Sequence, residues 1–127
     1  MLAAAVPPAG AAFSCTPVAV WDGDGPIWCA EGPRIRLAGV AARELDGNCR
    51  RGHPCPAASG IQARDALVQL LGSARGQTRD GHVRVRGPAL ACRSRGPDRY
   101  GRTLATCRGR SGDLGTALVQ AGVALRW

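Results

Sequence analysis

Six cysteines in a chain of 127 residues constrain this fold more than any other feature of the sequence. Three Trp, one Tyr and one Phe are its only aromatic residues, so the core must consist mainly of aliphatic side chains, which bury less area per residue. A small domain with a modest core gains from covalent cross-links. An even number of cysteines without a Cys-x-x-Cys pair predicts disulfides and an oxidising location, secreted or periplasmic.

The pairing of these cysteines is only partly indicated by turn signals, and sequence alone leaves many connectivities open. Cys92 and Cys107 flank the turn-like segment 96–101. If that turn joins two antiparallel strands, the two sulfurs face each other across the ladder. Cys49 and Cys55 would close the polar loop between them.

These two pairs leave Cys15 and Cys29 as the third, on either side of a turn. A zinc site that uses Cys49, His53 and Cys55 is the competing interpretation. That spacing matches no common structural zinc pattern, and a fourth ligand would have to come from elsewhere, so disulfides are the preferred interpretation.

Turn residues and hydrophobic periodicity predict strands, a helix, further strands and a closing helix. The central helix spans 59–71, where Ser59 and Gln62 form a capping box and Gly72 stops the helix. Asp113 caps the short closing helix. The expected strands are 17–21, 26–30, 34–40, 82–86 and 103–108, and the expected long loop is 73–81. This order predicts a mainly β, α+β fold: a five-stranded OB-fold barrel with an inserted helix and a C-terminal helix.

Alternation along the third strand predicts that Ile35 and Leu37 face the core, and that Arg34 and Arg36 lie on the solvent face. The N-terminal residues 1–14 are uncharged and rich in Ala and Pro. They are interpreted as a leader remnant or a disordered arm, which leaves residues 15–127 as the single domain. No run approaches the roughly 18 to 20 apolar residues of a membrane span, and a monomer is expected.

The charge of the chain indicates a polyanionic partner. Lys and Arg number 17 against nine Asp and Glu, a net charge of +8, and every one of these cations is arginine. Arginine binds phosphate through a planar fork and keeps its charge at all physiological pH values. DNA or RNA is therefore the first candidate partner, although an unusual base composition of the gene would also enrich Arg, Ala and Gly.

Three short segments carry the groups that phosphodiester cleavage needs. Asp22 and Asp24 flank a glycine, Arg36 is followed eight positions later by Glu44, and Arg102 ends the run Asp-Arg-Tyr-Gly-Arg. Such cleavage requires a carboxylate that activates water, cations that hold the phosphoryl oxygens, and usually a metal held by further carboxylates. Taken singly, each segment could be only a turn or a solvated charge.

In this order and spacing, the segments resemble the staphylococcal nuclease (thermonuclease) family. The resemblance extends over about residues 17–127 and includes the closing helix. Its motifs are Asp22-Gly23-Asp24, Arg34 to Val40, Glu44, Asp98-Arg99-Tyr100-Gly101-Arg102, Asp113-Leu114 and Leu118 to Ala124. It implies an OB-fold nuclease that is exported and depends on calcium.

The resemblance also implies a role for each matching residue. Glu44 would act as the general base or position the attacking water. Arg36 and Arg102 would bind the phosphate and stabilise the charge that develops on its oxygens. Tyr100 would lie beside the phosphate, and Arg99 is a further substrate-binding candidate. Arg34, on the same strand face as Arg36, is the last member of that substrate-binding group.

The implied calcium site is incomplete. Asp24 and Asp22 match its carboxylates, and the main-chain carbonyl of Ala42 could serve as a ligand because that role needs no side chain. The family's second calcium-binding aspartate is replaced by Ala41, and its proline by Arg43. Calcium takes 6 to 8 oxygen ligands, so a missing carboxylate should weaken binding.

Two functions therefore remain open. The first is a metal-dependent nuclease that cleaves DNA or RNA without sequence preference. The second is a catalytically degenerate OB module that only binds nucleic acid. Its candidate contacts are Arg34, Arg36, Arg84, Arg86, Arg99 and Arg102. The intact Arg36, Glu44 and Arg102 favour the enzyme, whereas Ala41 favours the binding module.

Overall fold

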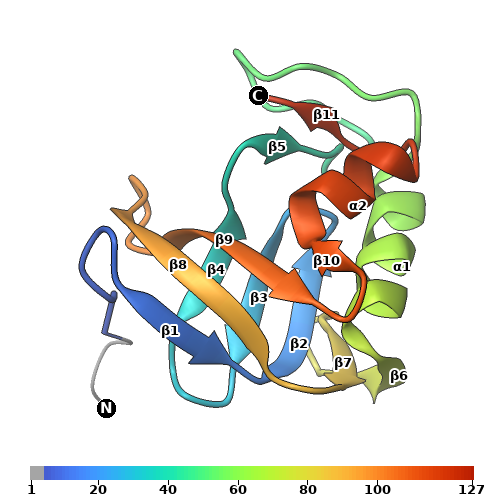
Figure 1. Cartoon of the computed structure of the whole chain (residues 1–127). Helices are drawn as coiled ribbons and strands as arrows, with labels where there is room; N and C mark the ends of the chain where they lie inside the picture. Colours follow the sequence, from blue (N-terminus) through green and yellow to red (C-terminus); the bar gives the residue numbers. More distant parts are fainter. Residues whose placement is uncertain (1–4) are drawn as a thin grey trace.

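The computed structural model describes residues 5–127. The chain is mainly β with two helices, and its larger sheet curls into a half-barrel with both helices to one side (Figure 1). The strands are β1 (Ala12–Cys15), β2 (Pro17–Asp22), β3 (Gly25–Cys29), β4 (Arg34–Leu37), β5 (Val40–Ala41), β6 (Ser73–Gln77), β7 (Val83–Arg86), β8 (Leu90–Pro97), β9 (Thr103–Gly109), β10 (Gly112–Asp113) and β11 (Leu125–Arg126). The helices are α1 (Gly60–Leu71) and α2 (Leu114–Gln120).

The larger sheet has the order β1-β8-β9-β4-β3-β2-β7-β6, with β10 paired to β9, and β5 pairs separately with β11. The described chain thus contains more strands than the five expected. Residues 73–77 form strand β6, where a loop was expected, because their main chain pairs with β7 although every side chain is exposed. Such an edge strand carries no apolar alternation, so it cannot be predicted from its sequence pattern.

The sheet also extends into the segment expected to be an arm. Strand β1 begins at Ala12 and pairs antiparallel with β8. The Ser94 hydroxyl donates a hydrogen bond to the Pro7 carbonyl at 2.7 Å, which ties residues further upstream to the same strand. Residues 1–4 of the predicted leader lie outside the described residues.

All three predicted disulfides are present: Cys15–Cys29, Cys49–Cys55 and Cys92–Cys107. Cys92 and Cys107 are direct partners in the β8–β9 ladder, as the turn between them predicted. Because Cys49 and Cys55 are bonded to each other, the zinc interpretation is wrong. Three disulfides indicate that the protein matures in an oxidising compartment.

Both predicted helices are confirmed. The Ser59 hydroxyl accepts a hydrogen bond from the Gln62 N–H at 3.0 Å, and the Gln62 side chain accepts one from the Ser59 N–H, which completes the capping box. The Asp113 carboxylate accepts a hydrogen bond from the Thr116 N–H at 2.8 Å and caps α2. No helix among the described residues is both long enough and apolar enough to cross a bilayer.

The core lies between the concave face of the sheet and the two helices. Helix α1 contributes Leu67 and Leu71, and the sheet contributes residues such as Ile27 and Ile35, all fully buried. Strand β7 shows the expected alternation, with its valines buried and its arginines exposed. This core fixes the curvature that brings the ends of β2, β4 and β9 together.

Candidate active site

The parallel pairing of β4 with β9 brings Arg36 and Arg102 to one face of the sheet. Arg36 lies opposite Leu104 in this ladder. Side chains two residues apart on a strand share a face, so Arg102 points to the same side as Leu104 and Arg36. Both arginines line one pocket of about 750 Å³. The structure therefore brings together the two arginines that the sequence placed far apart.

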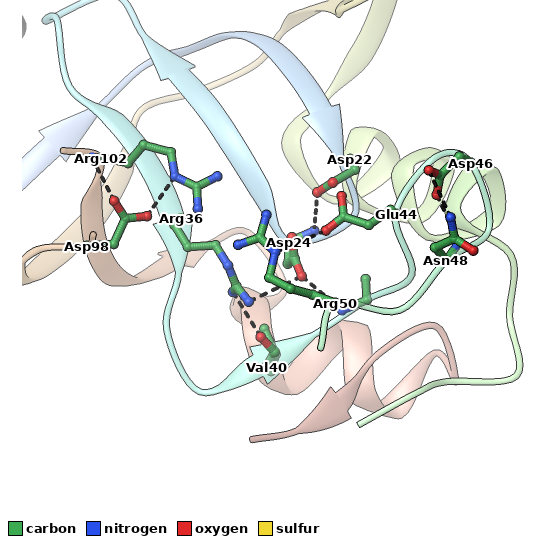
Figure 2. Close-up of polar contacts among 11 residues, drawn as sticks. Asp22, Asp24, Arg36, Val40, Glu44, Asp46, Asn48, Arg50, Asp98 and Arg102 are labelled. Carbon is green, nitrogen blue, oxygen red and sulfur yellow. Dashed lines mark hydrogen bonds and ion pairs between the residues drawn. The ribbon is translucent and has the colours of Figure 1, made fainter. Parts of the chain in front are cut away.

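Arg36 is buried, which corrects the expectation that it lies on a solvent face. Its residue is 5% exposed, and its Nη2 lies 3.3 Å from Asp24 Oδ2. Nη1 donates a hydrogen bond to the Val40 carbonyl at 2.9 Å and another to the Leu37 carbonyl. Alternation did place Arg36 opposite the core, but its guanidinium is enclosed there by Asp24 from the β2–β3 turn and by Val40 from the segment after β4 (Figure 2).

Asp24 reaches Arg36 because the β2–β3 turn packs against the end of β4. The Asp24 carbonyl accepts a hydrogen bond from the Leu37 N–H at 3.0 Å. Gly25, with a φ of +115°, lies so close to β4 that a Cβ atom there would overlap the Ile35 carbonyl oxygen. Only glycine satisfies both the positive φ and the close approach.

Asp22 lies buried beside two other carboxylates. Burial, the charge of Asp24 and then the charge of Glu44 together raise the pKa of Asp22 to about 10. Without a bound cation, this group of carboxyls therefore keeps a proton above the pH at which an ordinary aspartate loses it. Asp22 Oδ1 also accepts the Asp24 N–H at 3.3 Å. Figure 2 shows Asp22, Asp24 and Glu44 converging from two segments of the chain.

Glu44 is positioned by its main chain rather than by its side chain. Its N–H donates to the Asn48 carbonyl at 2.8 Å, and its carbonyl accepts from the Gly47 N–H at 2.9 Å, which closes a tight turn. The first residue of α1, Gly60, packs directly on this turn, and a Cβ atom there would overlap the Glu44 carbonyl. Helix α1 thus holds Glu44 next to the β2–β3 turn.

The Glu44 carboxylate has a cationic partner that the sequence did not single out. Glu44 Oε1 lies 3.4 Å from Arg50 Nε, and both side chains are partly exposed. Arg50 belongs to the loop closed by the Cys49–Cys55 disulfide and lines the same pocket as Arg36 and Arg102. The only signal in the sequence was its place inside a short cross-linked loop.

Arg102 is held by its own turn. Its Nε donates to Asp98 Oδ2 at 2.7 Å, and Asp98 Oδ1 accepts the N–H groups of Tyr100 and Arg102, each at 2.9 Å. Burial acts to raise the pKa of Asp98, but these hydrogen bonds and the charge of Arg102 hold that pKa below its usual value. The turn Asp98 to Arg102 therefore presents a fixed guanidinium.

The exposed Tyr100 ring lies among arginines. The guanidinium carbons of Arg102, Arg50 and Arg99 lie 5.3, 5.4 and 5.7 Å from its centroid. Tyr100 and Arg99 line the pocket, in keeping with their expected place beside a substrate. Arg34 does not line it, because its guanidinium lies over the Trp28 ring, 4.4 Å from the centroid.

Ala41 and Ala42 follow β4 and run beside the acidic cluster, which consists of Asp22, Asp24 and Glu44. Ala41 is 1% exposed and pairs with Leu125 in the small β5–β11 sheet. The N–H of Ala42 donates to Asp24 Oδ2 at 3.0 Å. The main-chain group of Ala42 that contacts this carboxylate is thus its N–H, and a ligand role for its carbonyl stays a prediction.

Within residues 5–127, no three His, Cys, Asp or Glu side chains are arranged to bind one metal ion as they lie. Asp24 Oδ2 is already engaged by Arg36 and by the Ala42 N–H. The donor chemistry nevertheless suits a hard cation, because Asp22, Asp24 and Glu44 bring carboxyl oxygens together in one cluster. Asp22 and Asp24 are the residues that would hold it.

No family model matches the chain, and no curated protein matches it either. The assignment of a function therefore rests on the residues of the site and on their geometry.

Proposed function

We propose that this protein is a metal-dependent nuclease that hydrolyses phosphodiester bonds of DNA and RNA without sequence preference. The observation that carries the proposal is the shared pocket of Arg36 and Arg102. Asp24 and Glu44 do not line this pocket but pair with two of its arginines, Arg36 and Arg50, and Asp22 lies next to both carboxylates. Cations for the phosphate and a carboxylate for the water are the two requirements of this chemistry.

In this mechanism Glu44 takes a proton from the attacking water. Arg36 and Arg102 bind the non-bridging oxygens of the scissile phosphate and stabilise the charge that develops there. Burial matters because Arg36, held by main-chain carbonyls and Asp24, needs no reorganisation when the charge develops. The phosphorus–oxygen bond to the leaving group breaks as the water oxygen bonds to phosphorus, and the leaving oxygen takes a proton from solvent water.

Calcium is the proposed cofactor, held by Asp22 and Asp24. When bound, it would neutralise phosphate charge and polarise the water. The buried Ala41 supplies no oxygen from its side chain, so we propose a weak site that needs calcium in the millimolar range.

The half-barrel with two flanking helices agrees with the family resemblance of the sequence, and we propose that it is an OB-type barrel of the thermonuclease kind. The disulfides agree with export, to the medium or the periplasm. The protein is proposed to act as a monomer on single chains of nucleic acid.

The alternative is a module that binds nucleic acid but does not cleave it. The observation in its favour is that every proposed catalytic charge is already paired: Arg36 with Asp24, Arg102 with Asp98, and Glu44 with Arg50. If the calcium site never forms, these pairs leave an arginine-rich pocket suited to binding alone.

The test is cleavage of heat-denatured DNA in millimolar calcium and in chelator, by the native protein, Glu44→Gln and Glu31→Gln. Glu31 is a matched control, because it is an exposed glutamate whose carboxylate binds Thr16 and not an arginine of the pocket. We expect calcium-dependent cleavage that Glu44→Gln reduces by at least about a hundredfold and Glu31→Gln leaves intact. Retention of DNA without cleavage by the native protein would establish the alternative.

A further inference from the structure

We propose that Arg50, presented by the disulfide-closed loop 49–55, is a third phosphate-binding residue of the pocket, and that it leaves Glu44 when a nucleic-acid strand binds. This inference rests on the proposed function, because it concerns the same pocket and the same substrate class. It adds a residue and a cross-link to which nothing in the sequence motifs assigned a role.

Arg50 lies where it can contact a bound phosphate, although its partner in the free protein is Glu44. It lines the pocket with Arg36 and Arg102, and its guanidinium carbon lies 5.4 Å from the centroid of the Tyr100 ring. The same ring is contacted by Arg102 from 5.3 Å, so the two arginines approach one point of the pocket wall. Two arginines around one aromatic ring form a positively charged platform for a phosphate.

The Glu44–Arg50 pair is the most exposed of the three arginine–carboxylate pairs around the pocket. The Arg50 and Glu44 side chains are 38% and 30% exposed, against 6% and 13% for Arg36 and Asp24. It is also the longest, at 3.4 Å, whereas Arg102 and Asp98 lie 2.7 Å apart. Exposed ion pairs are weak. An arriving phosphate can therefore take Arg50 from Glu44 at little cost, and Glu44 becomes free to accept a proton from water.

The loop holds Arg50 in place through three restraints. The Cys49–Cys55 disulfide closes its base. The His53 N–H donates to the Arg50 carbonyl at 3.0 Å. The His53 ring stacks on Trp127 with centroids 3.8 Å apart, which fixes the loop to the segment after β11. A guanidinium on an unrestrained loop would lose more conformational freedom on binding, so the cross-link should raise affinity.

The test measures binding of a fluorescent single-stranded oligothymidylate in chelator, where no cleavage is expected. The variants are Arg50→Ala, the double replacement Cys49→Ser with Cys55→Ser, and all three changes together. Arg75→Ala is the matched control, because it removes the same charge from the exposed strand β6 outside the pocket. Circular dichroism verifies that each variant keeps its fold.

We expect Arg50→Ala to weaken binding about three- to tenfold and to lower the salt slope by about 0.7, while Arg75→Ala changes affinity less than twofold. Removing the Cys49–Cys55 disulfide should weaken binding by no more than Arg50→Ala does. The triple variant should lose no more than Arg50→Ala alone, because the disulfide acts through Arg50. Equal effects of Arg50→Ala and Arg75→Ala, or additive losses in the triple variant, would overturn the proposal.

Different results would overturn the nuclease proposal and the inference about Arg50. If the native protein never cleaves DNA but Arg50→Ala still weakens binding, the nuclease proposal falls and the role of Arg50 stands. If calcium-dependent cleavage is normal and Arg50→Ala binds like the native protein, only the inference about Arg50 falls.

Discussion

The two arginines of the proposed site are held in contrasting ways. Arg102 and its partner Asp98 belong to one five-residue turn, and every contact that orients them lies within it. Arg36 depends on groups from separate segments: the Asp24 carboxylate from the β2–β3 turn and the main-chain carbonyls at the end of β4 and in β5. One half of the site is built locally, and the other by tertiary packing.

This difference predicts how each half of the site responds to substitution. A locally built turn can lose a contact without disturbing the barrel. The half around Arg36 shares its contacts with the acidic cluster and with the ends of β2 and β4. A substitution there should therefore disturb these segments as well.

Arg36→Ala should cause the largest loss, about 3 to 5 kcal/mol of unfolding free energy. It leaves the buried Asp24 without its cation and two main-chain carbonyls without a donor. Arg34→Ala is the control, because that arginine lies exposed on the same strand. Denaturant unfolding measures both. Similar losses for the two variants would show that Arg36 is not held as described.

Asp22→Asn should stabilise the protein at high pH in the presence of chelator. The pKa of Asp22, about 10 in the folded chain against 3.8 for an ordinary aspartate, means that the folded state keeps a proton which the unfolded state releases. The contribution of Asp22 to stability is therefore complete below pH 4 and declines as the pH rises toward 10, by about 4 kcal/mol at most up to pH 7.

Unfolding free energies at pH 5, 7 and 9 measure this decline, with the exposed Asp46→Asn as the control. The native protein and the control should lose stability over this range, and Asp22→Asn should lose less. Parallel curves for all three proteins would contradict the burial of Asp22 beside Asp24 and Glu44.

Gly60→Ala should destabilise by about 1 to 3 kcal/mol, because the added methyl group overlaps the Glu44 carbonyl. Cleavage should fall as well, since the Glu44 turn must shift. Ile61→Ala, at the next and exposed position of α1, is the comparison and should change neither property by much. Thermal unfolding and a cleavage assay measure the two effects, and native-like cleavage by Gly60→Ala would show that α1 does not position Glu44.

Asp98→Asn should have the smallest effect on stability, about 1 kcal/mol at pH 7, because its contacts are confined to one turn. The lowered pKa of Asp98 gives the sign: its charge stabilises the fold above about pH 4, and this contribution is lost as the pH falls through the folded pKa. The difference between variant and native protein should therefore shrink at pH 3. A loss as large as that of Arg36→Ala would erase the contrast between the two halves.

The parts of the structure that follow from local rules were predictable from the sequence. The capping box of Ser59 and Gln62, the cap at Asp113 and the alternation in β7 depend on neighbours within a few residues. The cross-strand pairing of Cys92 with Cys107 follows from one turn. The position of Arg102 belongs to the same class, because its partner lies four residues away.

The parts that depend on packing between distant segments were not predictable. Alternation placed Arg36 on the correct face but could not show that turns cover that face. Gly60 and Arg50 act on Glu44 from outside its own segment, one through a close approach and the other through a cross-linked loop. Strand β6 forms only because β7 offers a free edge, and its own side chains carry no pattern.

The proposed mechanism requires Arg36 and Arg102 to act on one phosphate. The most direct measurement is calcium-dependent cleavage by Arg36→Lys, Arg102→Lys and the double variant, in which lysine keeps the charge but loses the planar fork. If both arginines hold the same phosphate, each single change lowers kcat/KM about tenfold or more, and the double variant loses far less than the product of the two. Losses of kcat/KM that multiply fully in the double variant, or a single variant that cleaves like the native protein, would contradict this shared role.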